Sequence, residues 1–355
     1  MPASFQADTM PLLIGSLPLK DHKAALKLVY DYTPEIPLWV QLPAFPQERM
    51  IPQFMPGLPG IIVENDKIII DTAAQNFDDQ MLEFYEEYVA VMDEEKDLQT
   101  SRFVLTAETA EGFMHFMAHT GSLLSLPAAV KGQITGPVTF TTGVHDQNKN
   151  AIFYNEQLRD AAVKLIALKA KWQVRQLSSL GCPVIMFFDE PALAGYGTSE
   201  FISISRDEIT VCFEEVIEAV QSQGALAGVH VCANTDWSLV LESSADIVSF
   251  DAYSYFDRFI LYPDLIKTFI ESGKILAWGI VPTGNTEDIE KASADSLVAL
   301  WEDEIKAVRE LGFARSRLLA QSLITPSCGV GSLSLDLAQK VLKLTRDVSQ
   351  RLRRS

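Results

Sequence analysis

Short apolar runs recur along the chain, and each of them ends in small or polar residues. Eight such runs can be recognised, at 10–16, 36–42, 129–136, 183–190, 225–234, 246–252, 274–280 and 317–322. Runs of this length without strict polar alternation are typical of strands that are buried on both faces of a parallel sheet. We therefore predict eight buried parallel strands.

Helical patterns lie between several of these runs. Apolar residues recur at three- and four-residue steps over 160–180, 207–223, 286–311 and 333–352, as in helices with one buried face. Alternating strands and helices imply a parallel sheet, and eight repeats imply a closed (β/α)8 TIM barrel. An open doubly wound sheet is the alternative. The count of eight and the lack of a glycine-rich nucleotide-binding motif argue against it.

One long segment between the second and third runs breaks this alternation. Residues 60–71 read as a β-hairpin with Asn65-Asp66 at its turn. Two helical patterns follow, at about 77–93 and 107–119. We interpret the segment 43–128 as an insertion over one end of the barrel, so that the whole chain, 1–355, forms a single TIM-barrel domain.

The composition is that of a globular protein, with 48% hydrophobic and 21% charged residues in a chain of 355. A net charge of −18 argues against a nucleic acid or an anionic membrane as partner. Four cysteines are too few for a disulfide scaffold, which suggests a reducing compartment. Residues 1–8 lack the basic and apolar regions of a signal peptide, and no window holds 18 uninterrupted apolar residues. We therefore expect a cytoplasmic protein with no membrane span.

The candidate chemistry lies at the predicted carboxyl ends of the strands, where the active sites of such barrels are found. His230 and Cys232 are two residues apart in one predicted strand and should therefore face the same side. Cys328, beyond the eighth strand, and Asp251, at the tip of the sixth, should reach the same rim. Other residues expected at this rim are Ser16, Gln41, Gly136, Asp189, Glu190, Val281 and Ser322.

Two thiolates, an imidazole and a carboxylate are typical zinc ligands. Zinc held by two thiolates and one imidazole can accept a substrate thiol at an open position, which favours alkyl transfer to sulfur. The alternative is that these residues are buried core side chains, as we expect for Cys182 and Cys212. His115 and His119 are four residues apart on a predicted helix, and we assign them to helix packing and not to a metal site.

Four motifs in this order resemble the catalytic C-terminal barrel of cobalamin-independent methionine synthase. The same superfamily includes uroporphyrinogen decarboxylase and the zinc methyltransferases of methanogens. The motifs are Ile14-Gly-Ser16, Ile134-Thr-Gly-Pro-Val-Thr139, Asp189-Glu-Pro-Ala-Leu193, and His230-x-Cys232 with Cys328-Gly329. The resemblance covers nearly the whole chain.

The resemblance implies a ligand set and a substrate. Zinc would be bound by His230, Cys232 and Cys328, with Asp251 in the place of the family's glutamate ligand. The substrate would be homocysteine, with its amino group held by Asp189. Its carboxylate would be held by the segment Ile14, Gly15 and Ser16, where backbone N–H groups and a hydroxyl can bind an anion.

Several departures from the folate-using synthases bear on the methyl donor. Those synthases have an additional N-terminal half, a Trp after Gly-Pro-Val-Thr, and a His after the seventh strand. This chain has no Trp in 136–143 and no His in 279–285. The family's acidic substrate contact after the second strand is not assigned to one residue within 41–48. A folate nitrogen needs a general acid to leave, whereas a cobalt corrinoid does not.

The departures together resemble a short "core" methionine synthase. The expected methyl donor is then methylcobalamin or a methylated corrinoid protein, and not folate. One alternative is methyl transfer to another thiol of the coenzyme M type, although its sulfonate would not suit Asp189. A second alternative is a non-catalytic, zinc-holding docking subunit for a corrinoid protein, which would not need an amino-acid pocket. A porphyrinogen-type decarboxylase would have no use for the thiols.

Overall fold

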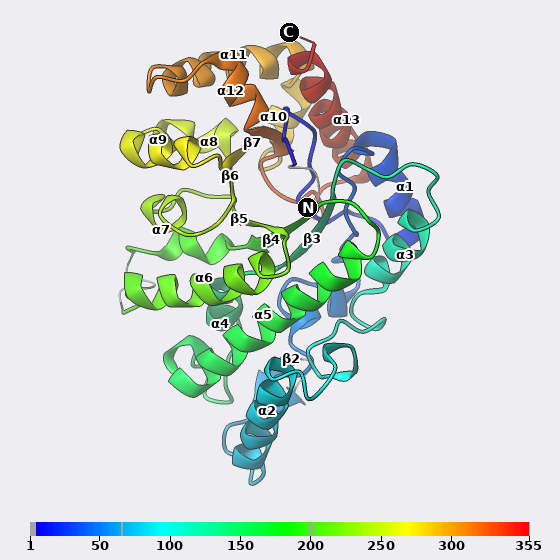
Figure 1. Ribbon diagram of the computed structural model, residues 1–355, viewed down its shortest axis with the longest axis vertical. Coiled ribbons are helices and arrows are strands. Elements are labelled where there is room, and N and C mark those ends of the chain that lie inside the picture. Colours follow the sequence, from blue (N-terminus) through cyan, green and yellow to red (C-terminus); the bar gives the residue numbers. More distant parts are fainter. Residues whose placement is uncertain (1–4, 65–66, 199–200, 202, 355) are drawn as a thin grey trace.

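A six-stranded parallel sheet forms the centre of the molecule (Figure 1). The computed structural model describes residues 5–64, 67–198, 201 and 203–354. The strands follow one another in chain order and are β3 (Val130–Thr135), β4 (Val184–Asp189), β5 (Leu226–Val231), β6 (Ile247–Phe250), β7 (Ile275–Val281) and β8 (Ser322–Pro326). The sheet curls as half of a barrel, and five of its strands are buried along their whole length.

The register of the sheet aligns the carboxyl ends of its first strands. Thr135 pairs with Asp189, Asp189 pairs with His230, and His230 pairs with Ser249. Side chains of paired residues in neighbouring strands point to the same face. Three polar side chains from β4, β5 and β6 therefore lie in one row beside one another.

The first two apolar runs do not form regular strands, which corrects the prediction of eight. They are extended and make single parallel bridges, from Pro11 to Ile324 in β8, from Ser16 to Gln41, and from Leu38 to Lys131 in β3. A proline has no backbone N–H to donate to a ladder, and Pro11 and Pro37 lie within these two runs.

The eighth run was also placed wrongly. Residues Arg315–Ala320 form a short helix, α12, and β8 begins only at Ser322. Ser322 is therefore at the amino end of β8 and away from the rim. The buried face of α12 is supplied by Leu318, while its arginines reach the surface. Cys328 still reaches the rim, because it follows β8 by two residues.

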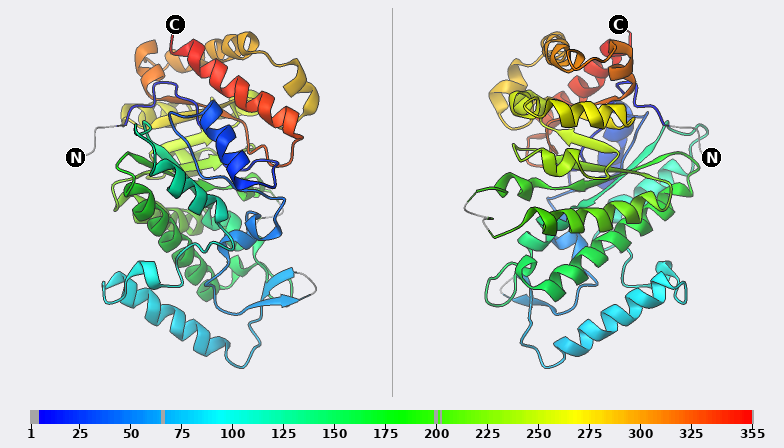
Figure 2. Two further views of the ribbon diagram at one scale, coloured as in Figure 1. Left: turned by 90° about the vertical axis from the view of Figure 1, so that its right-hand side faces the viewer. Right: turned by 60° about the vertical axis from the view of Figure 1, so that its left-hand side comes forward.

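Helices cover the outer face of the sheet (Figures 1 and 2). They are α1 (His22–Tyr32), α4 (Pro137–Gly143), α5 (Glu156–Ser178), α6 (Arg206–Gln221), α7 (Ser238–Leu241), α8 (Ala252–Phe259), α9 (Pro263–Glu271), α10 (Thr286–Lys291), α11 (Ala294–Arg309), α12 and α13 (Leu335–Leu352). The predicted helices at 160–180, 207–223 and 333–352 are confirmed. The one predicted at 286–311 is divided into α10 and α11, because Ser293 caps a new helix. In the described part of the chain, no helix has the length and apolar character needed to cross a bilayer.

The segment between the second run and β3 contains the predicted hairpin and helices. The hairpin consists of β1 (Ile61–Glu64) and β2 (Lys67–Ile70), and the turn predicted at Asn65-Asp66 lies outside the described residues. The helices are α2 (Phe77–Met92) and α3 (Glu111–Thr120). Single 3-10 turns lie at Pro46–Glu48, Pro52–Phe54 and Leu98–Thr100. Figure 2 shows the hairpin and α2 at the far end of the molecule, whereas α3 lies beside α1.

The concave face of the sheet is apolar at one end and polar at the other. A small buried cluster that includes Leu12, Ile36, Ile185 and Phe187 joins the two N-terminal runs to the strands. Strand residues two apart point to the same face, so Asp189 faces the same interior as Phe187. The apolar cluster closes the amino end of the curled sheet and leaves the carboxyl end to the candidate site.

Candidate metal and substrate site

A cavity of about 300 Å³ opens at the carboxyl ends of the strands. Most of the rim residues expected from the sequence meet here, together with residues from the loops that follow the second run and β8. The lining residues are Ile14, Ser16, Gln41, Pro43, Glu48, Met50, Asp189, Pro191, His230, Cys232, Cys328, Gly329, Gly331 and Ser332.

His230, Cys232 and Cys328 come together at the wall of this cavity. One ligand atom from each lies within 4.8 Å of the other two, and within the described ranges no other set of His, Cys, Asp or Glu side chains does this. The Nδ1 atom of His230 is hydrogen-bonded to the hydroxyl of Ser249 (2.9 Å). Its Nε2 atom is buried and, among the described residues, has no hydrogen-bond partner. A histidine oriented through one nitrogen, with the other nitrogen free, is arranged as a metal ligand.

The two thiols perturb each other. A hydrogen bond from Cys328 lowers the pKa of Cys232. The same hydrogen bond raises the pKa of Cys328, and burial adds a smaller effect in the same direction. The lowered pKa favours the thiolate form at Cys232 over that at Cys328. Because a thiolate is the form of cysteine that binds a metal ion, the pair fits a thiophilic cation.

Asp251 is close to these residues but is used differently. Its side chain accepts the backbone N–H of Ser254 (2.9 Å) and so caps the start of α8. Burial raises the pKa of this carboxyl above its usual value, against the opposing effects of Ser254 and His230. Asp251 is not one of the three residues that the structure brings within 4.8 Å of one another. Its role as a fourth ligand stays a prediction.

Asp189 ends β4 and faces the cavity beside His230. Its Oδ1 atom is buried without a hydrogen-bond partner in the part of the chain that is described. Burial raises its pKa, and Lys131 and His230 oppose that shift. Lys131 is fully buried inside the curled sheet, where burial lowers its pKa to about 8. An unpartnered carboxylate oxygen on a cavity wall offers a site for a ligand cation.

The Ile14–Ser16 segment closes another side of the cavity. Lys131 donates to the carbonyl of Ile14 (2.6 Å), and the hydroxyl of Ser16 accepts the N–H of Gly331 (3.2 Å). Gly15 lies against Gln41, whose Oε1 would be only 2.7 Å from an added Cβ. Ile14 and Ser16 line the cavity, whereas Gly15 lies behind Gln41 and does not line it.

Glu190 supports the strand end from behind. Its carboxylate accepts the backbone N–H groups of Val138 (2.9 Å) and Thr139 (2.8 Å) and the Thr139 hydroxyl (2.7 Å). It therefore caps the start of α4. A Cβ on Gly136 would fall 2.3 Å from this carboxylate, which explains the glycine in the Ile-Thr-Gly-Pro-Val-Thr motif.

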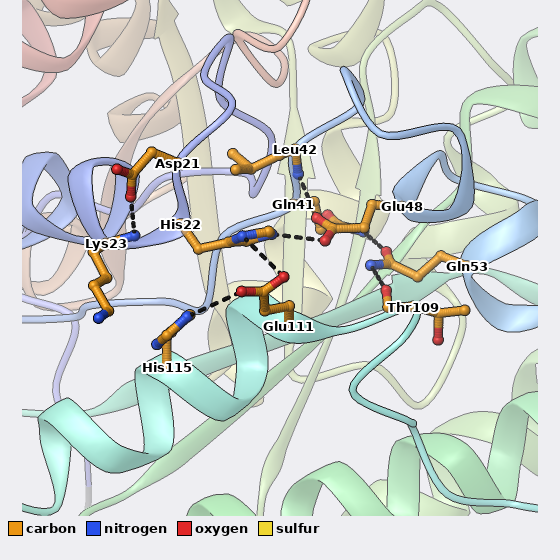
Figure 3. A network of polar contacts seen from close by, with 10 residues as sticks. All are labelled: Asp21, His22, Lys23, Gln41, Leu42, Glu48, Gln53, Thr109, Glu111 and His115. Atoms are coloured by element: carbon orange, nitrogen blue, oxygen red, sulfur yellow. Dashed lines mark hydrogen bonds and ion pairs between the residues drawn. The ribbon is translucent and has the colours of Figure 1, made fainter.

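Glu48 was not among the site residues assigned from the sequence. It is 2% exposed and lines the cavity from the 3-10 turn after the second run. Its charge in a proline-rich loop was visible in the sequence, but its partner His22 is far away along the chain. Nε2 of His22 is hydrogen-bonded to Oε1 of Glu48 at 2.7 Å (Figure 3). The cavity therefore presents two carboxylates, from Glu48 and Asp189.

A comparison with known proteins assigns the chain to a family. A family model described as the catalytic domain of cobalamin-independent synthase matches residues 107–351, well over half of the chain. Among curated proteins, none matches this sequence.

Two solved structures show partial similarity. One is a B12-independent methionine synthase from Shewanella sp. W3-18-1 in complex with selenomethionine, at 17% identity, 67% coverage of each chain and a TM-score of 0.46. The other is the catalytic domain of a GH26 endo-beta-1,4-mannanase from Bacillus sp. JAMB-750, at 16% identity, 61% coverage of each chain and a TM-score of 0.38. The family assignment rests on the matched region 107–351, which contains the motifs of Asp189, His230, Cys232 and Cys328. The chain therefore belongs to the cobalamin-independent synthase family and carries its catalytic domain.

Proposed function

We propose that this protein methylates the thiol of homocysteine and that His230, Cys232 and Cys328 hold a zinc ion for this reaction. The observation that carries the proposal is the convergence of these three side chains, within 4.8 Å, on the wall of a cavity that also contains two carboxylates.

The donor set fits zinc on the geometry of this chain. Two sulfurs and an imidazole nitrogen are a common zinc-binding combination, and the free Nε2 of His230 supplies the nitrogen. Zinc bound there would lower the pKa of a substrate thiol while leaving the sulfur nucleophilic. Ser249 fixes the imidazole ring through Nδ1, so that Nε2 is the atom available to the metal.

The cavity also fits an amino acid. We assign the substrate ammonium to the buried carboxylate of Asp189, with Glu48 as a second anionic wall. We assign the substrate carboxylate to the segment Ile14, Gly15 and Ser16, of which Ile14 and Ser16 line the cavity. An acceptor with a sulfonate and no amine, of the coenzyme M type, would be disfavoured by these two carboxylates.

Methyl transfer forms a bond from sulfur to the methyl carbon and breaks the bond from that carbon to the donor. The electron pair of the broken bond stays with the donor, and the thiol proton is lost. The chain's own residues supply orientation: they hold the amino acid so that its sulfur faces the open side of the cavity. A docking subunit without turnover would have no need for this amino-acid pocket.

We propose methylcobalamin, or a methylated corrinoid protein, as the methyl donor. The loop after β7 has no titratable side chain between Val281 and Glu287, so it offers no acid for a leaving folate nitrogen. The helix α4 that follows Gly136 has no Trp. A methylated folate is the alternative donor, and folate is the donor that this family normally uses. A cytoplasmic location and a corrinoid protein partner are part of the same proposal.

We also propose that the two N-terminal runs complete the curled sheet as a single-domain (β/α)8-like barrel, with 43–128 as an insertion. The supporting observation is the order of the bridges: Pro11 joins β8, Ser16 joins Gln41, and Leu38 joins β3. These bridges continue the strand order from β8 round to β3.

The test is a methyl-transfer assay on zinc-loaded protein with homocysteine, supplied in parallel with methylcobalamin and with methyltetrahydrofolate. We expect methionine to form with methylcobalamin and not with the folate. Formation with folate alone would overturn the proposed donor but not the proposed acceptor. No methionine from either donor, with zinc bound, would overturn the proposed reaction.

A further inference from the structure

Two cavity-wall side chains are each tied to the start of α3 by a buried polar residue (Figure 3). Helix α3 lies outside the cavity, in the segment that separates the second run from β3. One tie begins at Glu48 and the other at Gln41. Both end at residues 109–111, which are more than 50 positions away along the chain.

Both oxygens of Glu48 are occupied in the first tie. Oε1 is 2.7 Å from Nε2 of His22, and Oε2 accepts the N–H of Leu42 (3.0 Å). His22 is the first residue of α1 and is only 5% exposed, with its ring stacked on Phe45. The other ring nitrogen, Nδ1, is 3.6 Å from a carboxylate oxygen of Glu111.

Gln53 makes the second tie and is completely buried. Its Oε1 accepts from the side-chain amide of Gln41 (2.6 Å), and its own amide donates to the carbonyl of Thr109 (2.6 Å). Gln41 in turn covers Gly15. The tie therefore reaches the segment to which we assign the substrate carboxylate.

The first turn of α3 is also pressed against the backbone of the second run. A Cβ on Gly112 would lie 2.1 Å from the carbonyl oxygen of Val40, one residue before Gln41. Only glycine allows this approach. The start of α3 thus meets the second run in one close backbone contact, accepts a hydrogen bond from Gln53, and lies with Glu111 3.6 Å from the ring of His22.

We propose that the start of α3 fixes the positions of the cavity-wall residues Glu48 and Gln41, with His22 and Gln53 as the positioning residues. By fixing Glu48, His22 determines selectivity for thiols that carry an ammonium group. The ligand in this statement rests on the function proposed above. An unsupported glutamate samples several rotamers, and fixing it in advance removes that cost from binding. His22 fixes the carboxylate of Glu48, whereas Gln53 fixes the amide of Gln41 on the carboxylate-binding side.

The test compares two thiols by calorimetric binding to zinc-loaded protein. L-homocysteine has an ammonium group, and 4-mercaptobutyrate has the same thiol and carboxylate without it. In His22→Phe, which keeps the ring stack but removes the donor, we expect homocysteine to bind about tenfold more weakly. Binding of 4-mercaptobutyrate should change less than about twofold. His22→Gln, which keeps an N–H, should recover most of the loss.

A second measurement does not depend on the ligand. Hydrogen exchange of the Leu42 amide, which donates to Glu48, should be faster in His22→Phe than in the wild type. Met114→Ala, on the exposed side of α3, is the matched control and should leave both measurements unchanged.

The outcomes separate the two proposals. If the wild type binds neither thiol, the proposed function fails, and the selectivity proposal fails with it. If the wild type binds homocysteine and His22→Phe weakens both thiols equally, His22 has only a structural role and the inference is overturned. Unchanged binding of homocysteine and unchanged exchange at Leu42 would overturn it as well.

Discussion

The two walls of the cavity are built in different ways. On one wall, Asp189 and His230 lie side by side because the register of the parallel strands places them there, and Ser249 follows His230 in the same row. On the other wall, Ser16 and Glu48 come from irregular segments and depend on side-chain hydrogen bonds. A backbone ladder fixes its residues by many repeated bonds, whereas a loop wall depends on a few individual contacts.

This comparison shows where the site is sensitive to single substitutions. A change on the wall formed by the strands, the strand wall, should remove a functional group and leave its neighbours in place. A change behind the wall formed by irregular segments, the loop wall, should move groups that it does not itself replace. The predictions below use this contrast and run from the largest expected effect to the smallest.

The metal cluster joins the two walls, since Cys328 comes from a loop while His230 and Cys232 belong to β5 and its end. Cys328→Ser should lower zinc affinity and methyl transfer by at least ~100-fold, because it removes a direct ligand. Zinc content after dialysis and the assay rate give the measurement. Cys182→Ser is the control, and equal zinc loss in both variants would contradict the assignment.

Lys131 also crosses between the walls, from β3 to the carbonyl of Ile14. Its pKa is lowered from 10.5 to about 8 by burial, with Asp189 opposing. The folded protein therefore loses this proton at lower pH than the unfolded chain, and stability should rise as pH increases from about 8 to 10.5. The rise should approach about 3 kcal/mol in the free energy of unfolding.

Denaturant titrations at several pH values, on wild type and Lys131→Met, isolate this contribution. The difference in unfolding free energy between the two proteins should shift in favour of the wild type as pH rises. Parallel curves for the two proteins would show that Lys131 does not titrate in this window.

Asp189 tests the strand wall alone. Asp189→Asn keeps the shape and removes the charge, so homocysteine should bind about 30-fold more weakly, the loss expected for a charged hydrogen bond. 4-mercaptobutyrate should bind nearly as before, and the unfolding free energy should change little relative to this loss. Equal weakening of both thiols would show that Asp189 does not contact the ammonium.

Asp251 gives the smallest expected effect. Asn is also a good N-cap, so Asp251→Asn should change the free energy of unfolding by less than about 0.5 kcal/mol. Zinc stoichiometry should be unchanged if the cap seen at α8 is its main role. A marked loss of zinc would instead establish Asp251 as the fourth ligand.

Much of the strand wall could be predicted from the sequence. Alternation along β5 places His230 on the inner face, with Cys232 one residue beyond the strand end, and the end of β4 carries Asp189. The same pattern failed at 317–322, where a short amphipathic helix precedes the last strand. A six-residue apolar segment is compatible with either structure, and only packing decides between them.

The loop wall was decided by tertiary structure. Glu48 carries no pattern that marks it as a cavity residue, and its partner His22 lies 26 positions away. Gln53 and Thr109 are 56 positions apart. The sequence by itself determined the parallel sheet, the side on which the chemistry lies and the three candidate ligands, because strand periodicity is a local property. Which polar side chains support the wall was decided only in the folded chain, since a hydrogen bond between distant segments leaves no periodic trace in either of them.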